Sequence, residues 1–240
     1  MRILVLLILL PLMGCATAEN HYDPLESMNR KTDSFNDSLD KIVLKPLTEG
    51  YLTITPKFVQ QGVSNFFDNI TYPNVILNDF LQGKIKQGFM DITRLFANTI
   101  FGVGGLIDVA TDGGAPKNNE DFGQTLAVWG VGSGAYVVYP VFGPNSLRNT
   151  PDFATSYLTD GLTWLLAGAS ATVLVPVYLL KAVDSRARLD TAISLRDELS
   201  LDPYVFTRDA WRQRRDYLIY DGNPPQKEGP VTDGFDDENF

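Results

Sequence analysis

Apolar side chains recur at helical spacing through most of this 240-residue chain, and no strand-like alternation of useful length is present. Ile85, Phe89, Ile92 and Phe96 step by four, three and four residues, which places them on one face of a helix. The same spacing occurs over 25–42, 58–70, 74–81, 184–199 and 204–220. The sequence therefore predicts an all-α fold built from amphipathic helices.

Proline and capping residues mark the expected helix ends. Pro46 predicts a stop after the 25–42 segment, because proline lacks an amide hydrogen and clashes with the preceding turn. Thr55-Pro56 is typical of a helix start, with Thr55 as the N-cap. Asp202-Pro203 predicts the start of the last helix, which Gly222 ends.

The centre of the chain is dense in glycine. Residues 101–114 read FGVGGLIDVATDGG, and residues 130–134 read GVGSG. Such density favours sharp turns and close backbone packing over continuous helix. The apolar segment 137–142 contains Pro140, so it predicts either a hairpin-like excursion or two broken half-helices.

Residues 161–180 contain no charged side chain. As a single helix this stretch is about 30 Å long, enough to cross a hydrocarbon core. Gly168, the Ser170/Thr172 pair and Pro176 argue against a simple span. We expect the stretch to be embedded in a membrane, and a buried core helix is the alternative.

The amino terminus has the layout of a secretory signal. Arg2 precedes an apolar run over 3–13, which is too short to span a bilayer. The run ends in Leu-Met-Gly-Cys, which resembles a bacterial lipobox with Cys15 as the lipidated residue. The alternative is an ordinary signal peptide followed by a free cysteine, but Cys15 has no second cysteine to pair with, which favours lipidation. Ala16, in place of aspartate after the cysteine, is typical of outer-membrane sorting.

These features divide the chain into four expected segments. The first two are a signal peptide with lipobox at 1–14 and a lipidated tether at 15–22. A single helical domain then covers 23–222, and a disordered acidic tail, rich in proline and carboxylates, covers 223–240.

Composition excludes several classes of function. The formal net charge is −9, which argues against nucleic-acid binding because phosphate contacts need clustered Lys and Arg. The single histidine, His21, lies in the expected tether, and the single cysteine rules out a Cys-based zinc cluster. The segments 83–84, 102–105 and 130–134 match no phosphate loop, dinucleotide site or nucleophile elbow. We expect no catalytic residue, no cofactor and no metal.

A basic cluster occurs near the end of the last expected helix, at Arg208, Arg212, Arg214 and Arg215. A solvated helix face, favoured by the negative carboxyl end of the helix, explains it without any ligand. The alternative is contact with lipid headgroups or with an acidic protein partner.

Taken in order, motifs spread over nearly the whole expected mature chain resemble the MlaA/VacJ outer-membrane lipoproteins. Any one of these blocks is weak evidence, but their correct order behind a lipobox is specific. The blocks are Asp23-Pro24-Leu25-Glu26, Asn29-Arg30, Phe35-Asn36, Asn65-Phe66-Phe67-Asp68-Asn69, Leu81-Gln82-Gly83, Arg94 to Thr99, Gly102 to Ala110, Asp121 to Leu126, Trp129 to Gly132, Gly143-Pro144, Asp202-Pro203-Tyr204 and Arg208-Asp209-Ala210.

Two places depart from the family pattern. The first block has Ser27-Met28 where the family often has proline and an aromatic residue. The family usually has an Arg-Asp pair after its Gly-Pro block, whereas here Asn149 follows Arg148. If Arg148 pairs with a carboxylate, Asp152 is the expected substitute.

The resemblance implies a ring of amphipathic and membrane-embedded helices around a polar channel, with glycine-rich turns, in the periplasmic leaflet of the outer membrane. It implies association with trimeric porins and removal of misplaced phospholipids from the outer leaflet. The phospholipids pass to a soluble periplasmic carrier, which serves an inner-membrane ABC transporter, and lipid asymmetry is maintained. A structural porin-associated lipoprotein without transport activity is the alternative.

Two groups of residues are candidate sites within that frame. We expect a channel or gate at the end of one amphipathic helix and in the glycine turns that precede Asp108, whereas the simpler reading makes these residues core and turns. Its members are Asn65, Phe66, Phe67, Asn69, Gly102, Gly104, Gly105 and Asp108. The expected headgroup or partner contacts are Arg148, Arg212, Arg214 and Arg215.

Overall fold

The structure is a computed structural model that describes residues 23–225. The expected signal peptide, Cys15, the tether and all but the first residues of the acidic tail lie outside the described residues. The described elements are α2 (Glu26–Leu39), a π-helical turn η2 (Asp40–Leu44), α3 (Lys45–Ile54), α4 (Lys57–Thr71), α5 (Pro73–Leu81), α6 (Ile85–Ile100), α7 (Val109–Asp112), α8 (Phe122–Val128), β1 (Tyr136–Tyr139), β2 (Gly143–Ser146), α9 (Asp152–Thr159), α10 (Gly161–Leu165), α11 (Ala171–Leu199) and α12 (Pro203–Ile219).

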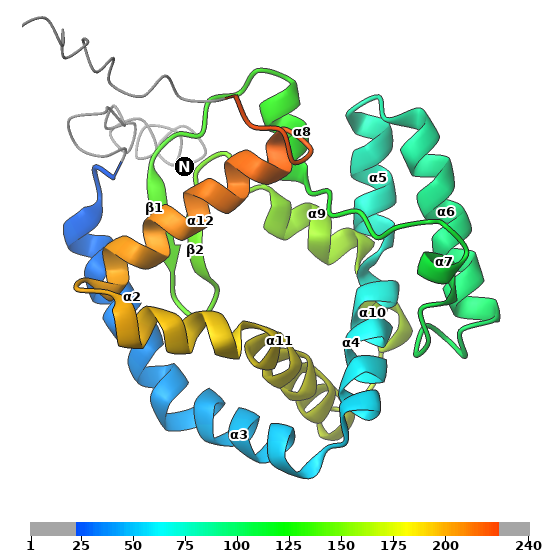
Figure 1. Ribbon diagram of the computed structural model, residues 1–240, viewed down its shortest axis with the longest axis horizontal. Coiled ribbons are helices and arrows are strands. Elements are labelled where there is room, and N and C mark those ends of the chain that lie inside the picture. Colours follow the sequence, from blue (N-terminus) through cyan, green and yellow to red (C-terminus); the bar gives the residue numbers. More distant parts are fainter. Residues whose placement is uncertain (1–22, 226–240) are drawn as a thin grey trace, which may run out of the picture.

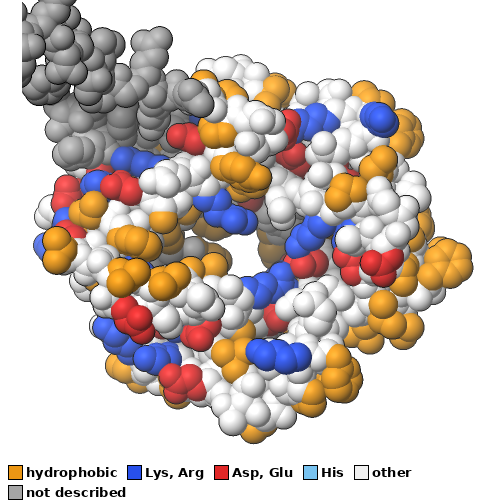
Figure 2. All heavy atoms as spheres, viewed as in Figure 1, with side chains coloured by type: hydrophobic (Ala, Val, Ile, Leu, Met, Phe, Trp, Pro, Cys, Tyr) orange, Lys and Arg blue, Asp and Glu red, His pale blue; other side chains and the backbone are white. Residues whose placement is uncertain are grey.

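The helices form a ring around a central opening, as expected for the fold class (Figure 1). α2, η2 and α3 make one side, and α11 packs along α3. α4 lies on the opposite side, while α5 and α6 pack against each other beside it. α12 and the β1–β2 hairpin complete the ring. Figure 2 shows the opening at the centre, with Lys or Arg side chains on several sides of it.

The only two strands of the described residues form the hairpin that was one of the two expectations for the segment around Pro140. They are antiparallel, with Tyr136 opposite Ser146 and Tyr139 opposite Gly143. Pro140 lies in the turn, where no ladder amide is needed, and Val141 has a φ of 70°. The half-helix alternative is therefore wrong, because the segment completes a strand pair instead.

Polar contacts close the ring between its first and last described helices. The buried Asn29 side chain donates to Asp23 Oδ1 at 2.8 Å and to the Tyr136 carbonyl at 3.0 Å. It also accepts from the Val138 amide at 2.9 Å. The second Asp23 oxygen accepts from the Tyr204 hydroxyl of α12. A small apolar core of Tyr136, Val138 and Tyr204 lies beside this joint.

The expected helix stop at Pro46 is wrong. The backbone widens into η2, where the Lys45 amide bonds to the Asp40 carbonyl, and α3 then continues through Pro46. Pro46 stands in the first turn of α3, where its missing amide hydrogen costs least. Thr55 likewise ends α3 rather than capping α4, which follows Pro56 with no side-chain cap.

The expectation of one long apolar helix over 161–180 is also wrong. α10 ends at Leu165, and a turn with Gly168 at φ 84° separates it from α11. α11 then joins the second half of that stretch to the charged segment 184–199, which was expected as a separate helix. Gly168 makes this break possible because glycine adopts positive φ without a Cβ clash.

Many large apolar side chains of the ring lie on its surface rather than in its interior. They include Phe58 and Phe101, which are 79% and 74% exposed, and the α10 residues Trp164 and Leu165. The buried core alternative for 161–180 therefore holds for Leu162 and for no other residue of the stretch. No helix among residues 23–225 has the length and apolar character needed to cross a bilayer.

Candidate functional site

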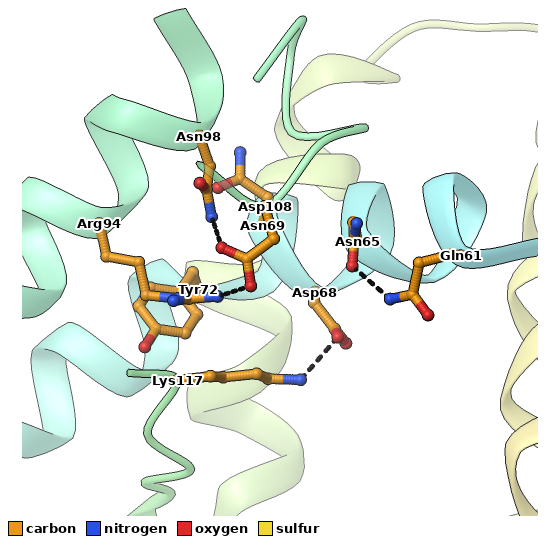
Figure 3. Close-up of a pocket in the computed structure, with 9 residues that line it drawn as sticks. All are labelled: Gln61, Asn65, Asp68, Asn69, Tyr72, Arg94, Asn98, Asp108 and Lys117. Atoms are coloured by element: carbon orange, nitrogen blue, oxygen red, sulfur yellow. Dashed lines mark hydrogen bonds and ion pairs between the residues drawn. The ribbon is translucent and has the colours of Figure 1, made fainter. Parts of the chain in front are cut away.

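Polar side chains of α4 and α6 face each other across a small cavity of about 150 Å³ (Figure 3). Asn65 and Asn69 share one face of α4 because they are four residues apart, and Tyr72 follows as the C-cap of α4. Arg94 and Asn98, also four residues apart, share one face of α6. We call this cavity the Asn65 pocket. Its lining residues are Gln61, Asn65, Asp68, Asn69, Tyr72, Arg94, Asn98, Asp108 and Lys117.

The glycine-rich segment packs directly on this face of α4. The Asn65 side chain donates to the Leu106 carbonyl at 3.1 Å. At Gly105, which has a φ of 92°, an added Cβ would lie 2.6 Å from the Asn69 side chain. At Gly102, a Cβ would lie 2.1 Å from the Ile107 carbonyl oxygen. Glycine is needed at both positions because the backbone approaches its neighbours more closely than a side chain allows.

Asp108 caps α7 and forms the centre of the charged network in the Asn65 pocket. Its carboxylate accepts from the Thr111 hydroxyl at 2.7 Å, from Asn98 at 3.1 Å and from Arg94. Partial burial by itself would raise the pKa of Asp108, but hydrogen bonds from Thr111, Arg94 and Asn98 outweigh it and lower that pKa to about 2. Asp108 is therefore ionised and tied to its neighbours rather than held out as an unpaired carboxylate.

Asp68 joins three parts of the chain at the other end of the Asn65 pocket. Its carboxylate pairs with Lys117 at 2.6 Å and with Arg188 of α11 at 2.7 Å. Arg188 also pairs with the buried Asp184, which accepts from Ser64 of α4 at 2.6 Å. This network fixes α4 against α11 and against the segment before α8.

The structure brings five of the eight expected gate residues into contact with one another or with shared neighbours. Asn65, Asn69 and Asp108 line the Asn65 pocket, and Gly102 and Gly105 lie against Asn98 and Asn69. The other three take different positions. Phe67 is buried, Phe66 packs edge-on against it, and Gly104 has open space where a Cβ would stand.

A second cavity, of about 180 Å³, lies where α12 meets the segment after β2. We call it the Arg148 cavity. Its lining residues are Ala127, Ser133, Arg148, Trp211, Arg212, Arg215, Asp216, Ile219 and Tyr220. It shares Ser133, Trp211, Arg212 and Asp216 with a neighbouring hollow of about 660 Å³ that also borders β1. The Arg148 cavity thus unites three of the four arginines expected to contact headgroups or a partner.

The fourth arginine, Arg214, is exposed and lines a separate hollow together with Arg215. Arg212 lies over the Tyr136 ring, with 5.5 Å between the guanidinium carbon and the ring centre. Arg215 pairs through both terminal nitrogens with the Asp121 carboxylate, where Nη2 is 2.9 Å from Oδ1. Arg215 is therefore held in place from the α8 side of the cavity.

Arg148 pairs with no carboxylate among residues 23–225, so the expected substitution by Asp152 is wrong. Its Nη1 donates to the Val131 carbonyl at 3.2 Å, and its buried Nε has no partner. Asp152 instead accepts from the Phe122 amide and from Ser156, at 2.9 Å each, which orients it away from pairing with Arg148. Burial and the nearby charge of Arg215 lower the pKa of Arg148.

Neither cavity has the donors of a metal site. Among residues 23–225, no three carboxylate, histidine or cysteine side chains are placed to hold a metal ion. What these cavities offer is hydrogen-bond donors, acceptors and charge, which suit binding and guidance of a polar group.

The sequence analysis missed several residues that the structure places at the centre of these networks. Arg94, Asn98 and Lys117 line the Asn65 pocket, and Asp121 and Asn149 hold Arg215. The available signal was the polar i, i+4 spacing of Arg94 and Asn98 on the face of α6 opposite the apolar seam.

Comparison with known proteins gives one consistent result. The family profile described as MlaA lipoprotein matches residues 21–218. The chain is 34% identical to the "Intermembrane phospholipid transport system lipoprotein MlaA" of Escherichia coli (strain K12) over 235 residues, which covers 95% of this chain and 92% of that protein. The protein of the same name from Haemophilus influenzae is 30% identical, with 95% and 94% covered.

A solved structure has the same fold. It is described as "Structural basis for maintenance of bacterial outer membrane lipid asymmetry" and superposes with a TM-score of 0.70 at 32% sequence identity. The match covers 82% of this chain and 98% of that chain.

Proposed function

The chain belongs to the MlaA lipoprotein family, and from this membership we propose that it is an outer-membrane lipoprotein which removes misplaced phospholipids from the outer leaflet. The relatives named above are lipoproteins of an intermembrane phospholipid transport system, and the similar solved structure concerns outer-membrane lipid asymmetry. In this proposal the protein hands each phospholipid to a soluble periplasmic carrier, and lipid asymmetry is maintained.

The observation that carries the proposal is a ring with apolar side chains on its outside and an opening at its centre (Figure 2). Apolar surface of this extent is costly in water, so it favours contact with lipid or with another protein. The exposed large apolar side chains of α4, α6, α10, α11 and the segment after α6 include Phe58, Phe89, Phe96, Ile100, Phe101, Trp164, Leu165, Val175 and Leu179.

The charged side chains beside the opening support passage of a polar headgroup. A charged group buried in hydrocarbon without a partner is costly, so a phospholipid needs a polar route for its head and an apolar one for its tails. In Figure 2, Lys, Arg, Asp and Glu side chains border the opening, while apolar side chains lie at several places around the outer rim. This arrangement offers both routes in one ring.

We place the protein in the periplasmic leaflet of the outer membrane, anchored through a lipidated Cys15. The lipobox-like sequence and Ala16 support this location, and more than one acyl chain is needed for stable anchoring. The exposed apolar residues of 161–180 then extend into the leaflet without spanning it. In this assignment the first described residue, Asp23, follows Cys15 closely, so the anchor keeps the ring at the membrane surface.

The proposed partners are phospholipids, trimeric porins of the outer membrane and the soluble carrier of the same pathway. The porins would surround part of the apolar rim, and the carrier would receive lipid on the periplasmic side. We propose no catalytic step, because moving a lipid between membranes requires no bond cleavage.

We retain the Asn65 pocket with its glycine segment as the proposed gate. Deleting one residue within 65–67 would rotate every later side chain of α4 by about 100°. That rotation removes Asp68 and Asn69 from the pocket and breaks the ion pairs of Asp68 with Lys117 and with Arg188, which keeps its pair with Asp184. We expect altered lipid flux per folded molecule and outer-membrane leakage even beside a normal copy. Instability with unchanged flux per folded molecule would assign these residues to the core instead.

A porin-binding scaffold without transport activity is the alternative function. A lipid-exchange assay separates the two: full-length lipidated protein is reconstituted in vesicles that contain fluorescent phospholipid, and transfer to a soluble lipid acceptor is measured. The proposal predicts transfer well above that of protein-free vesicles. A scaffold predicts the protein-free rate with porin binding intact.

The anchor has its own control in the same assay. Cys15→Ser protein carries the same ring but no acyl chains, so we expect it to leave the membrane fraction and to lose transfer from vesicles. Normal membrane fractionation and function of this variant would contradict lipid anchoring at Cys15.

A further inference from the structure

We propose that the Arg148 cavity binds a phosphate group, which accepts hydrogen bonds from the guanidinium groups of Arg148 and Arg215. The ligand class is a phosphate, either free or as the phosphodiester of a lipid headgroup. The second case deepens the function proposed above, whereas the first is independent of it.

The strongest observation is the unfilled hydrogen-bonding capacity of Arg148. Its guanidinium group has five N–H donors, yet within the described part of the chain one hydrogen bond is made, from Nη1 to the Val131 carbonyl. No carboxylate of residues 23–225 pairs with it, and its Nε is buried without an acceptor. A half-buried cation in this state is costly, and an anion would offset that cost.

Arg215 adds a second guanidinium group to the lining of the cavity, beside that of Arg148. Asp121 holds Arg215 from α8, and Asn149, with its amide oxygen toward Arg215, accepts from Nη2 and Nε at 3.0 and 2.8 Å. Gly123 leaves room for this contact, since a Cβ there would lie 2.4 Å from the end of the Asn149 side chain. Arg215 is therefore held in one fixed orientation, and of its five N–H donors one, on Nη1, remains for an oxyanion.

The charged side chains that line the cavity are mostly cationic. Arg148, Arg212 and Arg215 line it, with Asp216 as the only lining carboxylate. Asp121 offsets Arg215 from outside the lining. Cations therefore outnumber carboxylates in the lining, which favours an anionic ligand.

The space around the site also suits a phosphate that is part of a larger molecule. The cavity volume of about 180 Å³ exceeds by several-fold the roughly 30 Å³ that one water occupies in the liquid. The neighbouring hollow of about 660 Å³ begins at the shared residues Trp211 and Arg212 and continues past Tyr136. A headgroup bound at Arg148 could therefore extend along an aromatic wall.

The test measures binding of defined probes to the purified full-length protein in a neutral, phosphate-free detergent. Calorimetric titrations use inorganic phosphate in one arm and glycerophosphoethanolamine, a soluble phosphodiester without acyl chains, in the other. Arg148→Gln removes the positive charge and the planar set of N–H donors of the guanidinium group. Arg214→Gln is the matched control because it removes the same charge from an exposed position of α12. We expect binding to weaken about tenfold or more with Arg148→Gln and less than about twofold with Arg214→Gln.

The two arms identify the source of the phosphate. Binding of both probes that depends on Arg148 supports a general phosphate site, and binding of the diester alone supports a headgroup site. Binding of inorganic phosphate alone supports a site for the free anion. No binding of either probe, or equal affinity of the protein and its Arg148→Gln variant, overturns the proposal.

Two further measurements keep the result interpretable. If Arg148→Gln does not fold, Arg148→Lys replaces it, because lysine keeps the charge but lacks the planar guanidinium donors. The proposal then requires that this variant bind the probes more weakly than the unaltered protein. Unchanged affinity contradicts the proposal. Lipid exchange is measured in parallel. Absence of exchange with intact probe binding contradicts the transport function alone, whereas exchange without probe binding contradicts the phosphate site alone.

Discussion

The Asn65 pocket and the Arg148 cavity are both lined by charged side chains, but they differ in how those charges are paired. In the Asn65 pocket Arg94 pairs with Asp108, and Lys117 pairs with Asp68. In the Arg148 cavity Arg215 has a carboxylate partner, whereas Arg148 has only a backbone carbonyl. The first arrangement is complete within the protein, and the second leaves a cation for something else to neutralise.

The comparison shows that arginine has different roles in the Asn65 pocket and in the Arg148 cavity. A buried charge that loses its partner destabilises the fold, because the partner left behind keeps its desolvation cost. Removing a cation that already lacks an ion-pair partner changes the stability of the fold little. Substitutions should therefore reduce stability in the Asn65 pocket and reduce ligand binding in the Arg148 cavity.

The largest expected effect is that of Arg94→Ala. Arg94 is 4% exposed and donates to Asp108, to the Thr111 hydroxyl and to the Ala115 carbonyl. Its truncation removes all three bonds and leaves the Asp108 carboxylate without its ion-pair partner. We expect the free energy of unfolding to fall by about 3–5 kcal/mol, measured by denaturant unfolding in detergent. Arg94→Ala combined with Asp108→Asn should lose less than the sum of the two single variants. A loss below about 1 kcal/mol for Arg94→Ala would show that the network is not closed as described.

The next effect concerns Asp79, whose buried carboxyl contacts Asp91. Asp91 in turn accepts a hydrogen bond from Tyr72, which lines the Asn65 pocket. Burial, Asp91 and Glu120 raise the pKa of Asp79 to about 8, and its Oδ2 accepts no hydrogen bond, as expected if that oxygen carries the proton. Because the unfolded chain releases this proton near the ordinary value of 3.8, the stabilising contribution is complete below that pH. It is lost as the pH rises toward 8.

Asp79→Asn replaces the carboxyl group by an amide, which has nearly the shape of the protonated carboxyl but does not titrate. We expect its stability relative to the unaltered protein to increase between pH 5 and pH 8, by on the order of 1–3 kcal/mol. Thermal unfolding of both proteins across this range measures the difference. Parallel pH profiles would contradict protonation of Asp79 in the folded protein.

A smaller effect separates two neighbouring glycines of the turn on the Asn65 pocket. Gly104 and Gly105 both have positive φ, at 70° and 92°, so alanine is strained at each. Only at Gly105 does the added Cβ meet a side chain, that of Asn69 at 2.6 Å. We expect Gly105→Ala to cost about 1–2 kcal/mol more unfolding free energy than Gly104→Ala. Equal losses would mean that the turn does not press on α4.

The smallest expected effect on stability is that of Arg148→Gln. Since this side chain has no ion pair to lose, the free energy of unfolding should change by less than about 1 kcal/mol in either direction. A thermal shift measured without phosphate gives this number. A large destabilisation would show that the Arg148 cavity is as closed as the Asn65 pocket, and the contrast between the two would disappear.

The sequence by itself determined the helical class, several helix bounds and the family. Hydrophobic spacing and caps gave α5, α6 and α12 within a few residues, and Asp202 caps α12 through the Tyr204 and Val205 amides as its position before Pro203 predicts. These features depend on local geometry, which a window of a few turns contains. The same windows placed Asn65, Asn69 and the glycine turn as candidates, although Asn65 and Leu106 are 41 residues apart.

Only the tertiary structure decided which distant residues meet. Arg215 and Asp121 are 94 residues apart, and Tyr204 and Asp23 are 181 apart, so no local pattern pairs them. It also decided that helix continues past Pro46 and breaks at Gly168, because closing a ring fixes where the backbone turns and which helical faces remain outside. Residue types set what each side chain can bond to, and the closure of the ring selected the partners, so that no carboxylate of the described residues pairs with Arg148.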